Sequence, residues 1–88
     1  MEYVTKSIDL KSRPENLSER LVELGFESRG NERWAKQQIT AVEHSRELSG
    51  KKFYTLRFNT FECHEDQVKE LNRIHELLDR EYRHLKID

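Results

Sequence analysis

The chain has 88 residues, a length that predicts one domain spanning residues 1–88. Charged residues make up 38% of the sequence and nearly cancel, which leaves a formal net charge of -1, and the hydrophobic fraction is only 34%. No stretch approaches the ~20 apolar residues of a membrane-spanning helix. The apolar residues suffice for a thin core but not for the walls of a deep ligand pocket as well.

Cys63 is the only cysteine, so an intramolecular disulfide is excluded. Secreted domains of this size usually carry several disulfides. Residues 1–10 also lack the apolar stretch of a signal peptide. We therefore expect a cytoplasmic protein with no membrane partner.

The first third of the chain predicts a strand followed by a helix. Residues 2–10 have high strand propensity, and Pro14 fits the first turn of a helix over residues 14–24, where its missing N–H costs nothing. Gly25 predicts the end of that helix, because glycine readily adopts the left-handed conformation, and Phe26 can then pack back on the helix. The apolar face of the helix follows spacings of four and three and comprises Leu17, Leu21 and Leu24.

Residues 26–36 predict two extended arms joined by a tight turn. A two-residue turn would place Phe26 and Trp34 on opposite faces of the arms. A three-residue turn over residues 29–31 places both rings on the same face, where both reach the core. We favour the three-residue turn for that reason.

Residues 34–48 fit two structures. Their β-branched residues favour a strand, whereas the spacing of their apolar residues also fits a helix. We favour the strand because residues 52–61 alternate clearly between apolar and polar and need a neighbour. Ser49-Gly50 forms a tight hairpin turn back onto residues 39–47.

The last element is predicted as a helix over residues 64–86, about 34 Å long at 1.5 Å per residue. Its apolar stripe follows spacings of three and four and comprises Val68, Leu71, His75, Leu78, Tyr82 and Leu85. Such a helix is longer than the sheet it covers, so we expect its C-terminal end to project. The element order β-α-β-β-β-α predicts a two-layer α+β fold. It has an antiparallel three- to four-stranded sheet, two helices on one face and a long C-terminal helix.

No motif predicts catalysis or a bound cofactor. Structural zinc sites bring ligands in close pairs, and the spacing of Cys63, His64, His75 and His84 does not provide them. No nucleophile–base pair or phosphate-binding loop is recognisable. We therefore expect a protein that is not an enzyme and that has no metal and no cofactor.

The first functional hypothesis is a module that binds another protein by surface complementarity. Small compact domains of this kind are common among phage and bacterial accessory or inhibitor proteins. The projecting helix end would also allow a homo-oligomer. The candidate protein-binding residues are His75, Tyr82, Leu85 and Ile87.

The alternative hypothesis is an RNA- or DNA-binding domain that uses a basic hairpin surface. Residues 29–61 contain seven Lys or Arg and three Asp or Glu, whereas both flanks are acidic. Basic residues near an aromatic ring are typical of nucleic-acid surfaces, although basic residues also protect sheet edges from unwanted pairing. The candidates are Arg29, Arg33, Lys36, Arg46, Lys51, Lys52, Phe53 and Arg57.

From Pro14 onward, the predicted order α-β-β-β-α resembles double-stranded-RNA-binding domains and HicA-type toxins. Leu24-Gly25-Phe26, followed by a short hairpin, looks like the start of the HicA fold. The first resemblance implies a lysine-rich start to the last helix, but residues 62–66 are acidic there and would repel phosphate. The second implies a catalytic histidine in the second strand, and residues 34–36 contain none. No site residue is carried over from either family.

Overall fold

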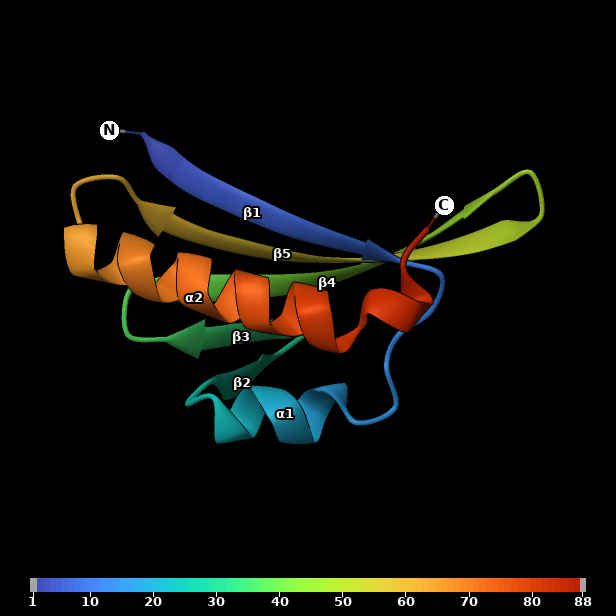
Figure 1. Cartoon of the computed structure of the whole chain (residues 1–88), viewed down its shortest axis with the longest axis horizontal. Coiled ribbons are helices and arrows are strands. Elements are labelled where there is room, and N and C mark those ends of the chain that lie inside the picture. The colour runs from blue at the N-terminus through green and yellow to red at the C-terminus, as the bar shows by residue number, and fades with distance from the viewer. Residues whose placement is uncertain (1, 88) are drawn as a thin grey trace.

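The computed structural model describes residues 2–87 and contains a five-stranded antiparallel sheet with two helices on one face (Figure 1). The elements in chain order are β1 (Tyr3–Leu10), α1 (Leu17–Glu23), β2 (Glu27–Gly30), β3 (Arg33–Lys36), β4 (Ile39–Leu48), β5 (Lys51–Phe61), α2 (Glu65–Glu81) and the short 3-10 helix η1 (Arg83–Leu85). The strand order in the sheet is β1-β5-β4-β3-β2, so the first strand lies at one edge beside the last.

The expected α+β class with an antiparallel sheet and two helices is confirmed, but the strand count and element order are wrong. The sheet has five strands instead of three to four, and four strands lie between the two helices. The hairpin over residues 26–36 forms as expected. The extra strand arises because a tight turn at residues 37–38, where Gln37 adopts a left-handed φ of 53°, divides the expected strand over residues 34–48 between β3 and β4.

The favoured strand at residues 34–48 is confirmed, because β3 and β4 occupy almost all of this segment. The predicted three-residue turn between β2 and β3 is wrong. Gly30 pairs with Arg33 across a two-residue turn, and the pairing register shifts between Ser28 and Gly30. This bulge adds one residue to β2 and places Ser28 opposite Trp34. Phe26 lies two residues before Ser28, so both rings still face the core, as expected.

The end of α1 has the predicted geometry. Gly25 adopts a φ of 97°, and its N–H donates to the carbonyl oxygen of Val22 at 3.0 Å. The N–H of Phe26 donates to the carbonyl oxygen of Leu21 at 2.9 Å. This pair of hydrogen bonds is a Schellman motif, which directs the chain from α1 into β2.

The core lies between the sheet and the two helices. Strand residues alternate between this core and the opposite face, as the period of two requires. Contacts between the helices close the core at one end, where Arg20 lies 2.9 Å from Glu81 and the Tyr82 hydroxyl donates to Asn16 at 2.9 Å. The buried apolar residues are Ile8, Leu10, Leu17, Leu21, Phe26, Trp34, Ile39, Ala41, Tyr54, Leu56, Phe58, Leu71, Ile74, Leu78 and Tyr82.

The predicted helix over residues 64–86 is too long. Helix α2 ends at Glu81, and the chain then folds back on β1 through η1. The carbonyl oxygen of Leu85 accepts the N–H of Lys11 at 2.7 Å, and Lys86 forms an isolated bridge with Leu10. These long-range hydrogen bonds, with the burial of Tyr82, outweigh continuation of the helix. The expected projecting helix end is therefore absent.

No helix within residues 2–87 combines the length and the apolar character that crossing a membrane requires.

Candidate binding surface

One face of the sheet carries no helix, and we name it the open face. Pairing registers between the strands define which side chains share it. Its residues are Tyr3, Thr5, Ser7 and Asp9 of β1; Phe53, Thr55, Arg57, Asn59 and Phe61 of β5; Thr40, Val42, His44 and Arg46 of β4; and Arg33 and Ala35 of β3.

The centre of the open face is basic. Arg33 pairs with Val42, and Val42 pairs with Arg57, so the two arginines lie in one row across three strands. Their Cα atoms are about 10 Å apart, which is two strand spacings. Arg46 follows four residues after Val42 on β4, with His44 between them. A shallow depression of about 370 Å³ lies here, lined by Ser7, Asp9, His44, Arg46, Thr55 and Arg57.

The three arginines of the open face have no acidic partner in the described part of the chain. Arg33, Arg46 and Arg57 are exposed, and within residues 2–87 none of them makes an ion pair or a side-chain hydrogen bond. Their guanidinium groups therefore present all their N–H donors to solvent.

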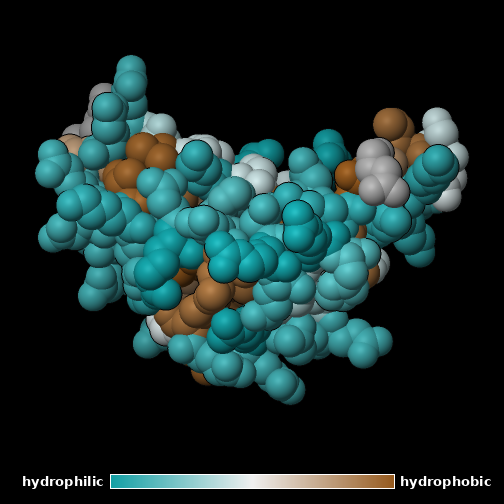
Figure 2. All heavy atoms as spheres, in the orientation of Figure 1, coloured by the Kyte–Doolittle hydropathy of each residue, from teal (hydrophilic) through white to brown (hydrophobic). Residues whose placement is uncertain are grey.

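Most cations on the helix-bearing side form ion pairs. This side is mostly hydrophilic at its surface (Figure 2), and six of its cations pair with carboxylates, whereas Lys69 and Arg83 have no ion pair within residues 2–87. The pairs are Arg13–Glu43, Arg20–Glu81, Lys36–Glu70, Arg73–Glu70, Arg80–Glu76 and Lys86–Asp79. Most cations of the helix-bearing side are thus paired, whereas Arg33, Arg46 and Arg57 on the open face have no ion pair within residues 2–87.

Hydrogen bonds between β1 and β5 hold the polar side chains of the open face in place. The Thr5 hydroxyl donates to Asn59 Oδ1 at 2.7 Å. The Thr55 hydroxyl donates to Asp9 Oδ1, also at 2.7 Å. The carboxylate of Asp9 is thus held by a hydroxyl rather than by an arginine.

Aromatic rings lie at both ends of the open face. At one end the rings of Tyr3 and Phe61 stack, with centroids 4.5 Å apart and planes inclined by 27°. The ring of His64 meets Phe61 edge-on at 6.0 Å. Tyr3 is 63% exposed, whereas Phe53, near the opposite end, is half-buried.

A buried carboxylate on the other side of β4 stiffens the sheet. Glu43 is only 6% exposed. It accepts hydrogen bonds from Arg13 Nε at 2.6 Å, Trp34 Nε1 at 2.8 Å and the Tyr54 hydroxyl at 2.8 Å. Burial alone would raise the pKa of the Glu43 carboxyl, but these hydrogen bonds together lower it below its ordinary value. Burial and the neighbouring Glu43 raise the pKa of the Tyr54 hydroxyl.

Sequence reasoning missed this cluster, although one signal for it was present. Glu43 continues the alternation of Ile39 and Ala41 in β4, so the period of two places its side chain on the core side of the sheet. A buried acid needs hydrogen-bond donors. Those donors come from segments far from Glu43 in the sequence, and no local pattern identifies them.

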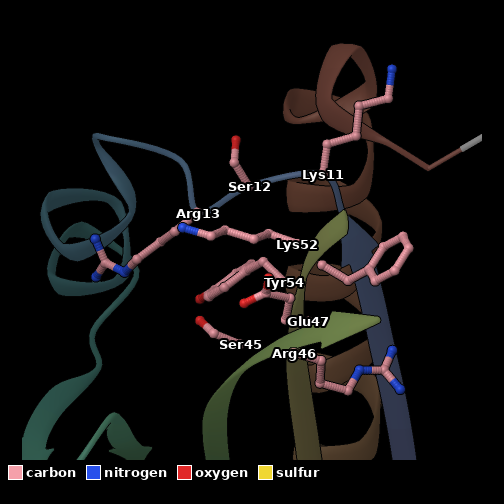
Figure 3. Close-up of a pocket in the computed structure, with 9 residues that line it drawn as sticks. Lys11, Ser12, Arg13, Ser45, Arg46, Glu47, Lys52 and Tyr54 are labelled. Carbon is pink, nitrogen blue, oxygen red and sulfur yellow. The ribbon is translucent and has the colours of Figure 1, made fainter. Parts of the chain in front are cut away.

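A second concave region lies at the end of the sheet, next to the β4–β5 hairpin (Figure 3). Its volume is about 380 Å³, and it is lined by Lys11, Ser12, Arg13, Ser45, Arg46, Glu47, Lys52, Phe53 and Tyr54. Lys11 and Arg46 point away from it (Figure 3). The guanidinium of Arg13 donates instead to Glu43 and, at 2.7 Å, to the Ser18 hydroxyl of α1. Lys11, Arg13 and Arg46 thus do not converge on one anion site, and only the side chain of Lys52 extends across the cleft (Figure 3).

The predicted basic hairpin residues do not all lie on one face of the sheet. The structure brings together Arg33, Arg46 and Arg57 on the open face, and exposed Lys51 follows at the hairpin end. Lys36 lies on the helix-bearing side, where its ammonium is 2.7 Å from Glu70.

The remaining members of that set lie near the β2 bulge or the β4–β5 hairpin, and the alternation along β5 places Lys52 on the side opposite Phe53. Arg29 sits in the β2 bulge and lies 3.8 Å from Glu27. Lys52 and Phe53 line the cleft of Figure 3. The alternation of side chains along each strand decides these positions, and total charge alone does not.

The predicted protein-binding residues do not form one surface. His75 Nε2 lies 3.0 Å from the carbonyl oxygen of Ser7, Tyr82 is buried, and Leu85 packs against the core. Ile87 is 38% exposed. Binding of another protein through these residues stays a prediction.

Ile87 instead borders an apolar groove beside the β4–β5 hairpin. The groove has a volume of about 750 Å³ and is lined by Asp9, Arg46, Glu47, Leu48, Phe53 and Ile87. Leu48 is 69% exposed there. Apolar atoms reach the surface at this hairpin (Figure 2).

Possible metal ligands are dispersed. Within residues 2–87, no group of three or more His, Cys, Asp or Glu side chains is placed to hold a metal ion. Cys63 is exposed at the turn before α2.

The chain matches no family model, no curated protein and no solved structure. Four strands separate α1 from α2. The element order therefore also departs from the α-β-β-β-α order on which the resemblance to double-stranded-RNA-binding domains and HicA-type toxins depends.

Proposed function

We propose that the protein is a non-enzymatic binding module that holds a nucleic-acid strand on the open face of its sheet. The observation that carries this proposal is the cluster of three arginines without an ion pair within residues 2–87, Arg33, Arg46 and Arg57, on one face of the sheet, whereas most cations of the helix-bearing side pair with carboxylates. The fold makes no use of these three charges, so they are available to a ligand.

The chemistry of the arginines suits phosphate. A guanidinium offers a planar fork of donors that matches two phosphate oxygens, and charge-assisted hydrogen bonds of this kind are the strong ones. Arg33 and Arg57 lie in one row, and Arg46 lies further along the neighbouring strand. A ligand with several regularly spaced negative charges can contact more than one of them, and nucleic acid is such a ligand.

The charge of the opposite side favours approach from the open face only. Helix α2 begins with Glu65 and Asp66 and contains six Asp or Glu against three Lys or Arg over residues 65–81. This net negative charge repels a polyanion. This difference in charge between the two sides favours binding of a nucleic-acid strand on the open face.

The test compares two triple variants with the same change in net charge. In the first, Arg33, Arg46 and Arg57 are each replaced by Gln. In the second, three exposed arginines of α2 and η1 are replaced by Gln: Arg73, Arg80 and Arg83. Affinity for a fluorescent oligonucleotide is measured by anisotropy over a series of salt concentrations.

We expect the wild type and the α2–η1 variant to bind with affinities that fall steeply as salt rises. The open-face variant should bind weakly and show a flatter salt dependence. Loss of three phosphate contacts to a single strand reduces the log–log slope by about 2. Equal weakening of both variants would show that net charge alone matters. Absence of binding by the wild type at low salt would point to a protein partner instead.

A further inference from the structure

We infer that the exposed ring of Tyr3 stacks on a nucleobase, so that the strand held on the open face is single-stranded. This inference rests on the proposed function and specifies its ligand. It starts from an aromatic pair that no part of the core requires.

The Tyr3 ring is held in position and remains accessible. It is 63% exposed and stacks on Phe61 at a centroid distance of 4.5 Å. Phe61 is itself braced edge-on by the ring of His64. Because Phe61 limits the motion of the Tyr3 ring before any ligand arrives, a base that stacks on it costs little additional ordering.

The aromatic pair lies on the same face as the arginines. Phe61 follows Arg57 on β5 by four residues, which corresponds to about 13 Å along the strand. Thr5 and Asn59, joined by their hydrogen bond, lie between the two positions. One strand of nucleic acid can thus place phosphates at the arginines and a base at Tyr3.

Stacking on Tyr3 distinguishes a single strand from a duplex. The arginines alone favour a duplex, because its phosphates are more densely spaced and release more counterions. The base faces of a duplex are hidden in its own stack, whereas those of a single strand can reach an aromatic side chain. A surface that combines arginines with an exposed aromatic ring should therefore bind a single strand more tightly than a duplex.

The experiment uses three ligands of equal length: a single strand, its duplex, and a single strand without bases. Anisotropy measures the affinity of each ligand for the wild type, Tyr3→Ala and Tyr3→Phe. The matched control is Leu48→Ala, which removes an exposed apolar side chain at the distant hairpin. Thermal unfolding confirms that each variant is folded.

We expect the wild type to bind the single strand about tenfold more tightly than the strand without bases, and more tightly than the duplex. Tyr3→Ala should lose both preferences and keep its affinity for the strand without bases. Tyr3→Phe and Leu48→Ala should keep both preferences.

Two outcomes overturn the inference in different ways. If Tyr3→Ala retains the preference for bases, or the wild type has none, while the open-face arginine variant still weakens binding, the stacking site is wrong and the proposed function stands. If no ligand binds the wild type, both are wrong.

Discussion

The two sides of the sheet contain the same residue types and use them differently. On the helix-bearing side, arginine and lysine join segments distant in the chain, as Arg13–Glu43 and Arg20–Glu81 illustrate. On the open face, Arg33 of β3 and Arg57 of β5 lie on either side of β4, and neither has an acidic partner within residues 2–87. The paired cations of the helix-bearing side contribute to folding, whereas the arginines of the open face remain available for binding.

The contrast extends to buried polar groups. Glu43 and Tyr54 satisfy each other inside the molecule, and no buried side-chain nitrogen or oxygen within residues 2–87 lacks a hydrogen bond. The open face instead exposes His44 and Ser7. Substitutions should therefore change stability on one side and ligand affinity on the other.

The largest effect on stability is expected from Glu43→Gln. The substitution removes the charge that holds Arg13, Trp34 and Tyr54 together, and one amide oxygen cannot replace two carboxylate oxygens. We expect a loss of about 3 kcal/mol in the free energy of unfolding, measured by urea denaturation. Glu47→Gln, on the same strand but exposed, is the control and should have little effect. Similar losses in both variants would contradict the role of the cluster.

A smaller effect is expected from the pH dependence of the ion pairs around Glu70. Hydrogen bonds from Arg73 and Lys36 lower the pKa of the Glu70 carboxyl from its ordinary 4.5 to about 2. Because the folded pKa is depressed, this stabilisation is present above pH 4.5 and is lost as the pH falls toward 2.

The comparison between wild type and Glu70→Gln isolates this contribution. Near neutral pH the wild type should be more stable by about 1 kcal/mol, since the pair is partly exposed. The difference should shrink steadily as the pH falls below 4.5. A difference in unfolding free energy that stays constant with pH would show that the carboxylate charge is not responsible.

The smallest effect on stability is expected from Arg57→Gln on the open face. Arg57 is exposed and has no partner within residues 2–87, so the free energy of unfolding should change by less than about 0.5 kcal/mol. Affinity for an oligonucleotide should nevertheless fall. A large loss of stability in thermal unfolding would mean that this arginine serves the fold, and the contrast between the two sides would then fail.

Local turn chemistry was predictable, because a few neighbouring residues decide it. Ser49 and Gly50 adopt φ values of 53° and 78° in the predicted hairpin turn, and Gly25 ends α1 as expected. The turn at Gln37 was not predictable, because glutamine carries no turn preference that would mark it. The β2 bulge was also missed, although the shared face of the two aromatic rings was correctly inferred.

The end of α2 shows where local pattern stops being sufficient. The apolar spacing continues through Tyr82 to Leu85 and predicts helix beyond Glu81. The chain turns instead because the Tyr82 hydroxyl donates a hydrogen bond to Asn16 and the Leu85 carbonyl oxygen accepts one from the Lys11 N–H. Neither partner is visible from within the segment.

The alternation of residues 52–61 is readable in the sequence alone, and with it the side chains of β5 that share a face, because a strand has a period of two. For residues 39–48 the sequence favoured a strand over a helix without excluding the helix. Which cations pair with carboxylates depends on the tertiary structure. Lys36 forms an ion pair with Glu70 of α2, whereas Arg57 lies on the face of the sheet that no helix covers. Ion pairing depends on which distant carboxylates the fold brings within a few ångströms, and that distance is a property of packing rather than of local sequence.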